Sequence, residues 1–129
     1  MNDLESGNFW RHLGMTTVVG DDGKTRVLMK VTENLKQFYG NVHGGAIASL
    51  MDSSIAVAIN QRLEPEEGAS TVELKINYLR PINKGNLWGE GKVIQKGRKI
   101  VVAQGEIKND EGQILAIGTA TFMIIKMVH

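Results

Sequence analysis

The chain has 129 residues, of which 42% are hydrophobic and 22% are charged, and its formal net charge is +1. This composition is that of a globular protein with one domain, which we expect to span residues 1–129. The near-neutral charge argues against a nucleic-acid-binding surface, because such surfaces normally carry a strong basic stripe. The absence of cysteine excludes disulfides, thiolate metal sites and cysteine nucleophiles.

The N-terminus and the length of the chain bear on its location and its association. The first residues are acidic where a signal peptide would be basic, and the most apolar stretch, residues 46–59, is too short and too polar to span a bilayer. We therefore expect a cytoplasmic protein with no membrane contact. Because a chain of this length buries only about two-thirds of its unfolded surface, pairing with a second copy is expected to add stability.

The predicted elements begin with a short helix over residues 4–13, which ends at Gly14. Residues 15–19 and 25–31 are predicted strands on either side of a hairpin turn rich in Gly and Asp. From residue 45 to residue 62, apolar side chains recur at helical spacing, and most residues between them are Ala, Ser or Val. This long helix is apolar nearly all round, so we expect it to be buried.

Four more strands are predicted after the long helix, over residues 71–78, 87–95, 100–108 and 114–125. The segments between them have turn chemistry, which predicts antiparallel pairing of consecutive strands in a meander. A sheet that curls around one apolar helix would bury that helix. From these patterns alone we predict an α+β protein with one helix on an antiparallel sheet.

A glycine-rich turn opens the long helix in the run GNVHGGAIASLMD, which spans residues 40–52 and places Asp52 nine positions after His43. Together with the strand TVELKINYLRP at residues 71–81, this run resembles the signature of the PaaI-like acyl-CoA thioesterases, and the resemblance extends over residues 27–125. It implies a hotdog fold, in which an antiparallel sheet wraps around the long helix. It also implies an acyl-CoA substrate, a homo-oligomer that is a dimer or a tetramer, and no metal or cofactor beyond the CoA of the substrate.

The turn at Gly44 and Gly45 is suited to binding a developing negative charge. Without Cβ atoms, the two glycines let another molecule approach the backbone. The first N–H groups of a helix have no partner inside the helix, and the helix dipole favours an anion there. We therefore assign Gly44 N–H to the carbonyl and oxyanion of a thioester, with Gly45 and the nearby Asn41 as substrate-binding residues. The alternative is that the glycines only permit a tight turn.

Asp52 lies on the side of the predicted helix away from its apolar stripe. A carboxylate in so apolar a helix is costly unless something compensates it, and as an anion it can act as a base or a nucleophile. The resemblance implies that Asp52 reaches the site of a neighbouring subunit and either activates water or attacks the thioester. The alternative is a structural carboxylate that is hydrogen-bonded to a hydroxyl or to the backbone.

The remaining candidate residues surround this turn or carry positive charge. His43 either polarises the thioester or holds the turn through a backbone hydrogen bond. By alignment with the family, Thr71 would help to place the attacking water, and Gln37 would hold water or the thioester. The phosphates of CoA require cations. The cations at strand ends and turns are Arg80, Lys84, Lys96, Arg98 and Lys99, of which we take Arg80, Arg98 and Lys99 as the substrate-binding candidates. The alternative is that these are ordinary solvated charges of turns.

Two other functions of the same fold are alternatives to thioester hydrolysis. Hydratases and dehydratases pair a His with an Asp or Glu in a different arrangement, and in this chain no Asp is followed five residues later by His. A non-catalytic acyl-CoA-binding protein is the second alternative, and loss of the carboxylate would be its expected sign. Because Asp52 is present, the sequence favours an enzyme.

Overall fold

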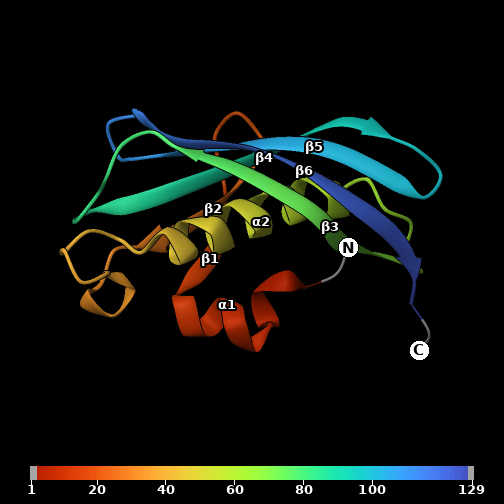
Figure 1. The fold of residues 1–129 in the computed structure, drawn as a ribbon. Coiled ribbons are helices and arrows are strands. Elements are labelled where there is room, and N and C mark those ends of the chain that lie inside the picture. Colours follow the sequence, from red (N-terminus) through yellow and green to blue (C-terminus); the bar gives the residue numbers. More distant parts are fainter. Residues whose placement is uncertain (1–2, 128–129) are drawn as a thin grey trace.

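The computed structural model describes residues 3–127 and shows one long helix lying against a single sheet (Figure 1). The sheet curves over one side of the helix α2, and the short helix α1 lies on the side of α2 away from the sheet. The helices are η1 (Leu4–Ser6), α1 (Asn8–Leu13), η2 (Glu33–Leu35) and α2 (Gly44–Asn60). The strands are β1 (Met15–Val19), β2 (Thr25–Lys30), β3 (Glu67–Tyr78), β4 (Asn86–Lys96), β5 (Ile100–Lys108) and β6 (Ile114–Lys126).

The strand order of the sheet is β1-β2-β4-β5-β6-β3, and every neighbouring pair is antiparallel. The predicted meander of four consecutive strands is therefore wrong, because only β4, β5 and β6 follow one another. β3 pairs with β6, and β4 pairs with β2. The connection over residues 79–85 is longer than a tight hairpin loop, which leaves β4 free to join the other side of the sheet. As a result, β3 forms an edge of the sheet.

A row of glycines allows α2 to lie close to the sheet. Gly91, Gly105 and Gly118 are paired across β4, β5 and β6. A Cβ at Gly91 would lie 2.6 Å from the backbone oxygen of Ser54, and a Cβ at Gly105 would lie 2.8 Å from the sulfur of Met51. Because the row carries no side chains, the helix can approach the strands closely, and its sheet-facing residues form the core. Fully buried core residues of α2 include Leu50, Met51 and Ile55.

The long helix is buried only on the side that faces the sheet. The opposite ridge of α2, named here the open ridge, is exposed or half-buried. The open ridge consists of Gly45, Ala48, Ser49, Asp52, Ser53 and Ala56. The expectation of a helix buried all round is therefore not met within one chain, because the sheet wraps one side only. In the described residues, no helix is long and apolar enough to cross a membrane.

The N-terminal segment departs from the single predicted helix. It folds as η1 and α1, separated by Gly7, whose backbone is extended (φ −64°, ψ 142°). The carboxylate of Glu5 accepts hydrogen bonds from the hydroxyl and the N–H of Thr17 at 2.6 and 2.9 Å. These bonds lower the pKa of Glu5 and fasten the segment to β1. Trp10, from α1, is part of the buried core.

Candidate functional site

The start of α2 is capped by the residue that precedes it. His43 has an extended backbone (φ −60°, ψ 136°), and its Nδ1 accepts a hydrogen bond from Gly45 N–H at 2.8 Å. The His43 carbonyl oxygen accepts from the N–H groups of Ala46 and Ile47 at 2.9 and 3.2 Å. His43 therefore satisfies three of the first four N–H groups of the helix. Gly44 N–H is the fourth, and the described residues provide no acceptor for it.

The direction of Gly44 N–H follows from the same hydrogen bonds. The His43 carbonyl and Gly44 N–H belong to one planar trans peptide, so the two groups point in opposite directions. Since the carbonyl points along α2 toward Ala46 and Ile47, the N–H points out of the helix N-terminus. The helix dipole favours negative charge at this position. Gly44 N–H is thus a donor without an acceptor in the described part of the chain, at the place where the sequence predicts an oxyanion site.

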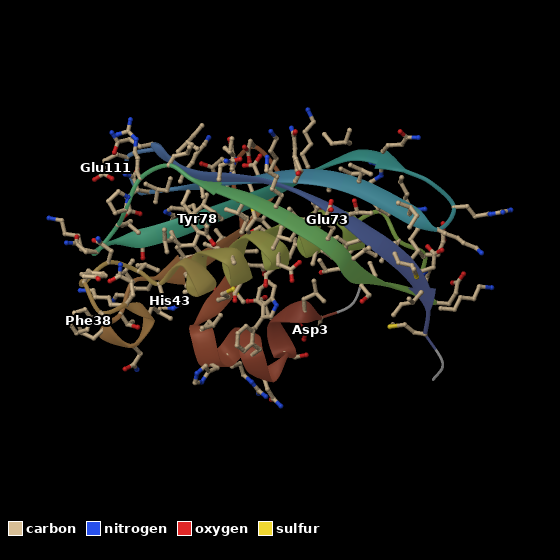
Figure 2. The ribbon with its side chains drawn as sticks, viewed as in Figure 1. Asp3, Phe38, His43, Glu73, Tyr78 and Glu111 are labelled. Carbon is tan, nitrogen blue, oxygen red and sulfur yellow. The ribbon has the colours of Figure 1, made fainter. Side chains whose placement is uncertain are left out.

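The hydrogen bond at Nδ1 also defines how His43 can act. A ring nitrogen that accepts a hydrogen bond carries no proton, so the neutral His43 ring has its proton on Nε2. The side chain is exposed at the helix N-terminus, near the turn that leads into α2 (Figure 2). Two roles were predicted for His43, and the structure contains the hydrogen bond from Gly45 N–H that holding the turn requires. A direct role would have to use Nε2–H as a donor.

Tyr78 contacts the turn at Gly44, and the sequence did not predict this contact. Its hydroxyl donates a hydrogen bond to the carbonyl oxygen of Gly44 at 2.9 Å. A Cβ on Gly44 would lie 3.5 Å from the Tyr78 ring, so the ring lines one side of Gly44. The sequence placed Tyr78 only at the end of the predicted strand over residues 71–78. Contact between residues 34 positions apart leaves no local signal in a sequence.

Asp52 lies on the open ridge of α2 and is hydrogen-bonded to Thr71. The Thr71 hydroxyl donates to Asp52 Oδ1 at 2.7 Å. Thr71 precedes a β-bulge in β3, where the register shifts between Thr71 and Glu73. This bond fixes the direction of the Asp52 carboxylate, so Thr71 orients Asp52. Because the Thr71 hydroxyl proton is used in this bond, the hydroxyl oxygen of Thr71 can contact water only as an acceptor.

One chain does not bring Gly44 and Asp52 together. They are eight residues apart on α2, which corresponds to about 12 Å along the helix axis. A reacting atom must lie about 3 Å from both an oxyanion donor and the group that activates its attacker. The edge strand β3 contacts both residues, through Tyr78 at Gly44 and Thr71 at Asp52.

The loop before the turn holds Gln37 and Asn41. Gln37 Oε1 accepts from Tyr39 N–H at 2.5 Å, and Gln37 N–H donates to the Asn41 carbonyl at 2.8 Å. The side-chain carbonyl oxygen of Gln37 is therefore used within the loop. A substrate or water molecule would have to bind the side-chain NH₂ group of Gln37. The loop displays Phe38 and Tyr39, which are 95% and 84% exposed.

The three predicted cationic residues lie at two ends of the sheet. Arg80 follows Tyr78, and its N–H donates to the Leu115 carbonyl. Arg98 and Lys99 lie in the β4–β5 turn, where the Lys99 carbonyl accepts from Ile124 N–H. Leu115 and Ile124 are nine residues apart on β6, or about 30 Å in an extended strand. Of these three residues, Arg80 is the one that lies at the Gly44 end within one chain.

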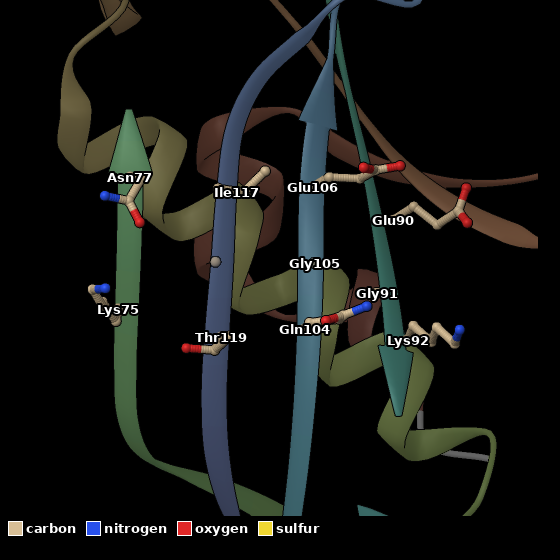
Figure 3. Close-up of a pocket in the computed structure, with 11 residues that line it drawn as sticks. Lys75, Asn77, Glu90, Gly91, Lys92, Gln104, Gly105, Glu106, Ile117 and Thr119 are labelled. Atoms are coloured by element: carbon tan, nitrogen blue, oxygen red, sulfur yellow. The ribbon is translucent and has the colours of Figure 1, made fainter. Parts of the chain in front are cut away.

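The outer face of the sheet carries a hollow that is separate from these residues. It has a volume of about 360 Å³, and Figure 3 shows its side chains in front of the sheet with α2 behind. One row across the strands contains Lys92, Gln104, Thr119 and Lys75. The neighbouring outward row contains Glu90, Glu106, Ile117 and Asn77. No group of three potential metal ligands occurs among residues 3–127.

Comparison with known proteins assigns the chain to a family. Residues 39–116, more than half of the chain, match the thioesterase superfamily. The chain is 25% identical to a 1,4-dihydroxy-2-naphthoyl-CoA hydrolase of Listeria monocytogenes, covering 88% of this chain and 93% of that protein. It is 30% identical to a medium/long-chain acyl-CoA thioesterase of Escherichia coli, covering 64% of this chain and 62% of that protein. A thioesterase structure from Haemophilus influenzae has a TM-score of 0.90 at 25% identity, covering 99% of this chain and 90% of that one, which confirms the predicted hotdog fold. The chain belongs to the thioesterase superfamily.

Proposed function

We propose that this protein is a PaaI-like acyl-CoA thioesterase that hydrolyses an acyl-CoA or aryl-acyl-CoA to the free acid and CoA. Thioester hydrolysis follows from its family, and the acyl-CoA substrate is the further step. The observation that carries the proposal is the Gly44 N–H at the N-terminus of α2, which has no acceptor among residues 3–127. The same helix carries the carboxylate of Asp52, which Thr71 orients. The named substrates of two relatives, an aryl and a medium/long-chain acyl-CoA, define the range to be tested.

In the proposed reaction, the thioester carbonyl oxygen binds at Gly44 N–H. Asp52 removes a proton from water, and the resulting hydroxide adds to the carbonyl carbon. The tetrahedral oxyanion is stabilised by Gly44 N–H and the helix dipole, an effect of about 10²–10³ in rate for one donor. The C–S bond then breaks, and the proton held by Asp52 passes to the CoA thiolate. Direct attack by the carboxylate would give an anhydride that water hydrolyses to the same products.

A site formed by two chains would bring the separated groups together. β3 is an edge strand that carries Thr71 and Tyr78 seven residues apart. If β3 pairs antiparallel with β3 of a second copy, the Thr71 end of one strand meets the Tyr78 end of the other. Asp52 of one chain then approaches Gly44 of the other, and two-fold symmetry creates two equal sites. The open ridge of α2 would face the second copy.

A tetramer would need a second interface, for which the outer face of the sheet is the candidate. Its row with Lys75 and Lys92 lies beside the row with Glu90 and Glu106. A copy rotated by two-fold symmetry can place each row against the oppositely charged one. The same face carries several apolar residues that are 40–54% exposed, namely Ile94, Ile100, Val102 and Met123.

The proposed function is tested with a panel of aryl-, short-, medium- and long-chain acyl-CoA esters, in which hydrolysis is followed by release of free thiol. Light scattering on the same sample is expected to give two or four times the chain mass of 14.2 kDa. An active protein that remains a monomer at micromolar concentration would contradict the two-chain site. Tight binding of these esters without thiol release would instead support a non-catalytic acyl-CoA-binding protein.

His43 provides a test of the capping role. Asn is among the best helix-capping residues, so His43→Asn is expected to keep the turn and most of kcat, whereas His43→Ala should cost about 1 kcal/mol of stability and lower kcat. Both variants are compared by thermal unfolding and by thioester hydrolysis. If His43→Asn is as stable as the wild type but as inactive as His43→Ala, the Nε2–H donor acts directly on the substrate and the cap alone is insufficient.

A further inference from the structure

Tyr78 meets Gly44 in two ways: its hydroxyl donates a hydrogen bond to the Gly44 carbonyl oxygen, and its ring lies 3.5 Å from where a Cβ of residue 44 would be. We propose that Tyr78 is a positioning residue, which fixes the conformation of Gly44 and with it the aim of the Gly44 N–H donor. The effect on rate rests on the proposed thioesterase function, whereas the effect on the conformation of the turn does not.

Gly44 is the residue of the turn that most needs an external contact. It has no side chain, so its backbone is the least restricted of any residue type, and it begins the helix, where helix ends fray. His43 is held by its own N–H bond to the Leu35 carbonyl at 2.7 Å and by its cap on Gly45. Tyr78 adds the corresponding contact to the Gly44 carbonyl, on the far side of the Gly44 Cα. His43 thus fixes the peptide group before the Gly44 Cα, and Tyr78 fixes the peptide group after it.

Tyr78 is itself held firmly enough to act in this way. It is the last residue of β3, where it pairs with Ala116 of β6. Beyond it, the N–H groups of Leu79 and Arg80 both donate to the Leu115 carbonyl, at 2.8 and 3.1 Å. The backbone that carries the Tyr78 ring is therefore fixed to the sheet on both sides of the residue. Figure 2 shows Tyr78 lying between the sheet and the first turns of α2.

The position of Tyr78 also links the two halves of the proposed site. The same strand carries Thr71, which orients Asp52, so β3 holds both the carboxylate and the residue that bears the oxyanion donor. Pairing of β3 with a second copy would then order both groups at once. An oxyanion donor stabilises the transition state more than the bound substrate. Loss of its alignment should therefore lower kcat with little change in KM.

The test compares Tyr78→Phe with Tyr39→Phe in the full-length protein. The chain has two tyrosines, and Tyr39 is 84% exposed, so the control removes a hydroxyl of the same kind from a solvent-facing residue. Tyr78→Phe is expected to lower kcat by about tenfold, with KM within about twofold, because alignment of one oxyanion donor is weakened but the donor remains. Tyr39→Phe is expected to match the wild type in both constants.

A second measurement does not depend on turnover. Amide NMR spectra and hydrogen exchange of ¹⁵N-labelled protein report on residues 44–46 directly. Tyr78→Phe should shift these amide signals and speed their exchange, whereas Tyr39→Phe should not. A wild-type protein that releases thiol from no acyl-CoA would refute the proposed function, and the NMR comparison would still decide the positioning role. Unchanged amide signals in Tyr78→Phe, or wild-type kcat in an active enzyme, would overturn the inference.

Discussion

Replacing Asp52 by Asn is expected to lower kcat by about 10³–10⁴-fold while leaving the affinity for acyl-CoA nearly unchanged. The amide oxygen of Asn can still accept the hydrogen bond that the Thr71 hydroxyl gives to Asp52 Oδ1. The substitution therefore keeps the shape and this contact, and it removes only the negative charge that activates water or attacks carbon. An interaction used mainly in the transition state contributes little to substrate binding. Stability should hold or rise, because a charge has left an apolar helix.

The measurement is single-turnover thioester cleavage, made alongside equilibrium binding of a non-hydrolysable acyl-CoA analogue. Asp22→Asn is a matched control, because it removes one carboxylate from the β1–β2 turn. Hydrogen bonds from Arg26 lower the pKa of Asp22 to about 2, so the same charge is lost near neutral pH. The control should cleave at the wild-type rate. Near-wild-type cleavage by Asp52→Asn would remove Asp52 from the mechanism and leave it the structural role of binding Thr71.

The sequence predicted most elements of this fold but not how the strands are ordered. The bounds of β1 and β5 were predicted without error, since turn residues and alternation are local signals. The crossover of β3 to β6 has no local signal, because it depends on a seven-residue connection that permits either pairing. The row of Gly91, Gly105 and Gly118 becomes visible only when the register is known. Each glycine alone reads as a weak point in a strand.

For the candidate site, the sequence predicted the part of the geometry that depends on neighbours along the chain. The turn from His43 to Gly45 and the position of Asp52 on one face of α2 both follow from spacing along one helix. The contact of Tyr78 with Gly44 depends on how the strands pair, so no spacing rule could predict it. The same holds for the separation of Arg80 from Arg98 and Lys99, which lie at opposite ends of the sheet. The bulge beside Thr71 is a similar case, since it re-aims a side chain by one inserted residue.

Gly44→Pro should remove the proposed oxyanion donor with little harm to the fold. Proline is favoured at the first position of a helix, and Gly44 is that residue. Proline also requires an extended residue before it, and His43 is extended. Since Gly44 N–H has no acceptor in the described part of the chain, no internal hydrogen bond is lost. We expect kcat to fall by about 10²–10³-fold at nearly unchanged thermal stability.

Gly44→Ala is the comparison variant, because it retains the N–H and adds only a Cβ at ordinary contact distance, 3.5 Å, from the Tyr78 ring. It should lose far less activity than Gly44→Pro when kcat and thermal midpoints are measured together. Equal losses in the two variants would indicate that added bulk, and not the missing donor, blocks the reaction. A wild-type kcat in Gly44→Pro would show that the thioester oxygen binds elsewhere.

Hybrid dimers of Asp52→Asn and Gly44→Pro chains then test whether the site is shared. In a hybrid, one site combines Gly44 from the first chain with Asp52 from the second, and both are intact. The other site contains both substitutions. Purified hybrids, isolated through two different tags, should therefore recover about half of the wild-type activity, although each parent is nearly inactive. If each site lay within a single chain, every site of the hybrid would carry one defect, and its activity would stay at the level of the parents.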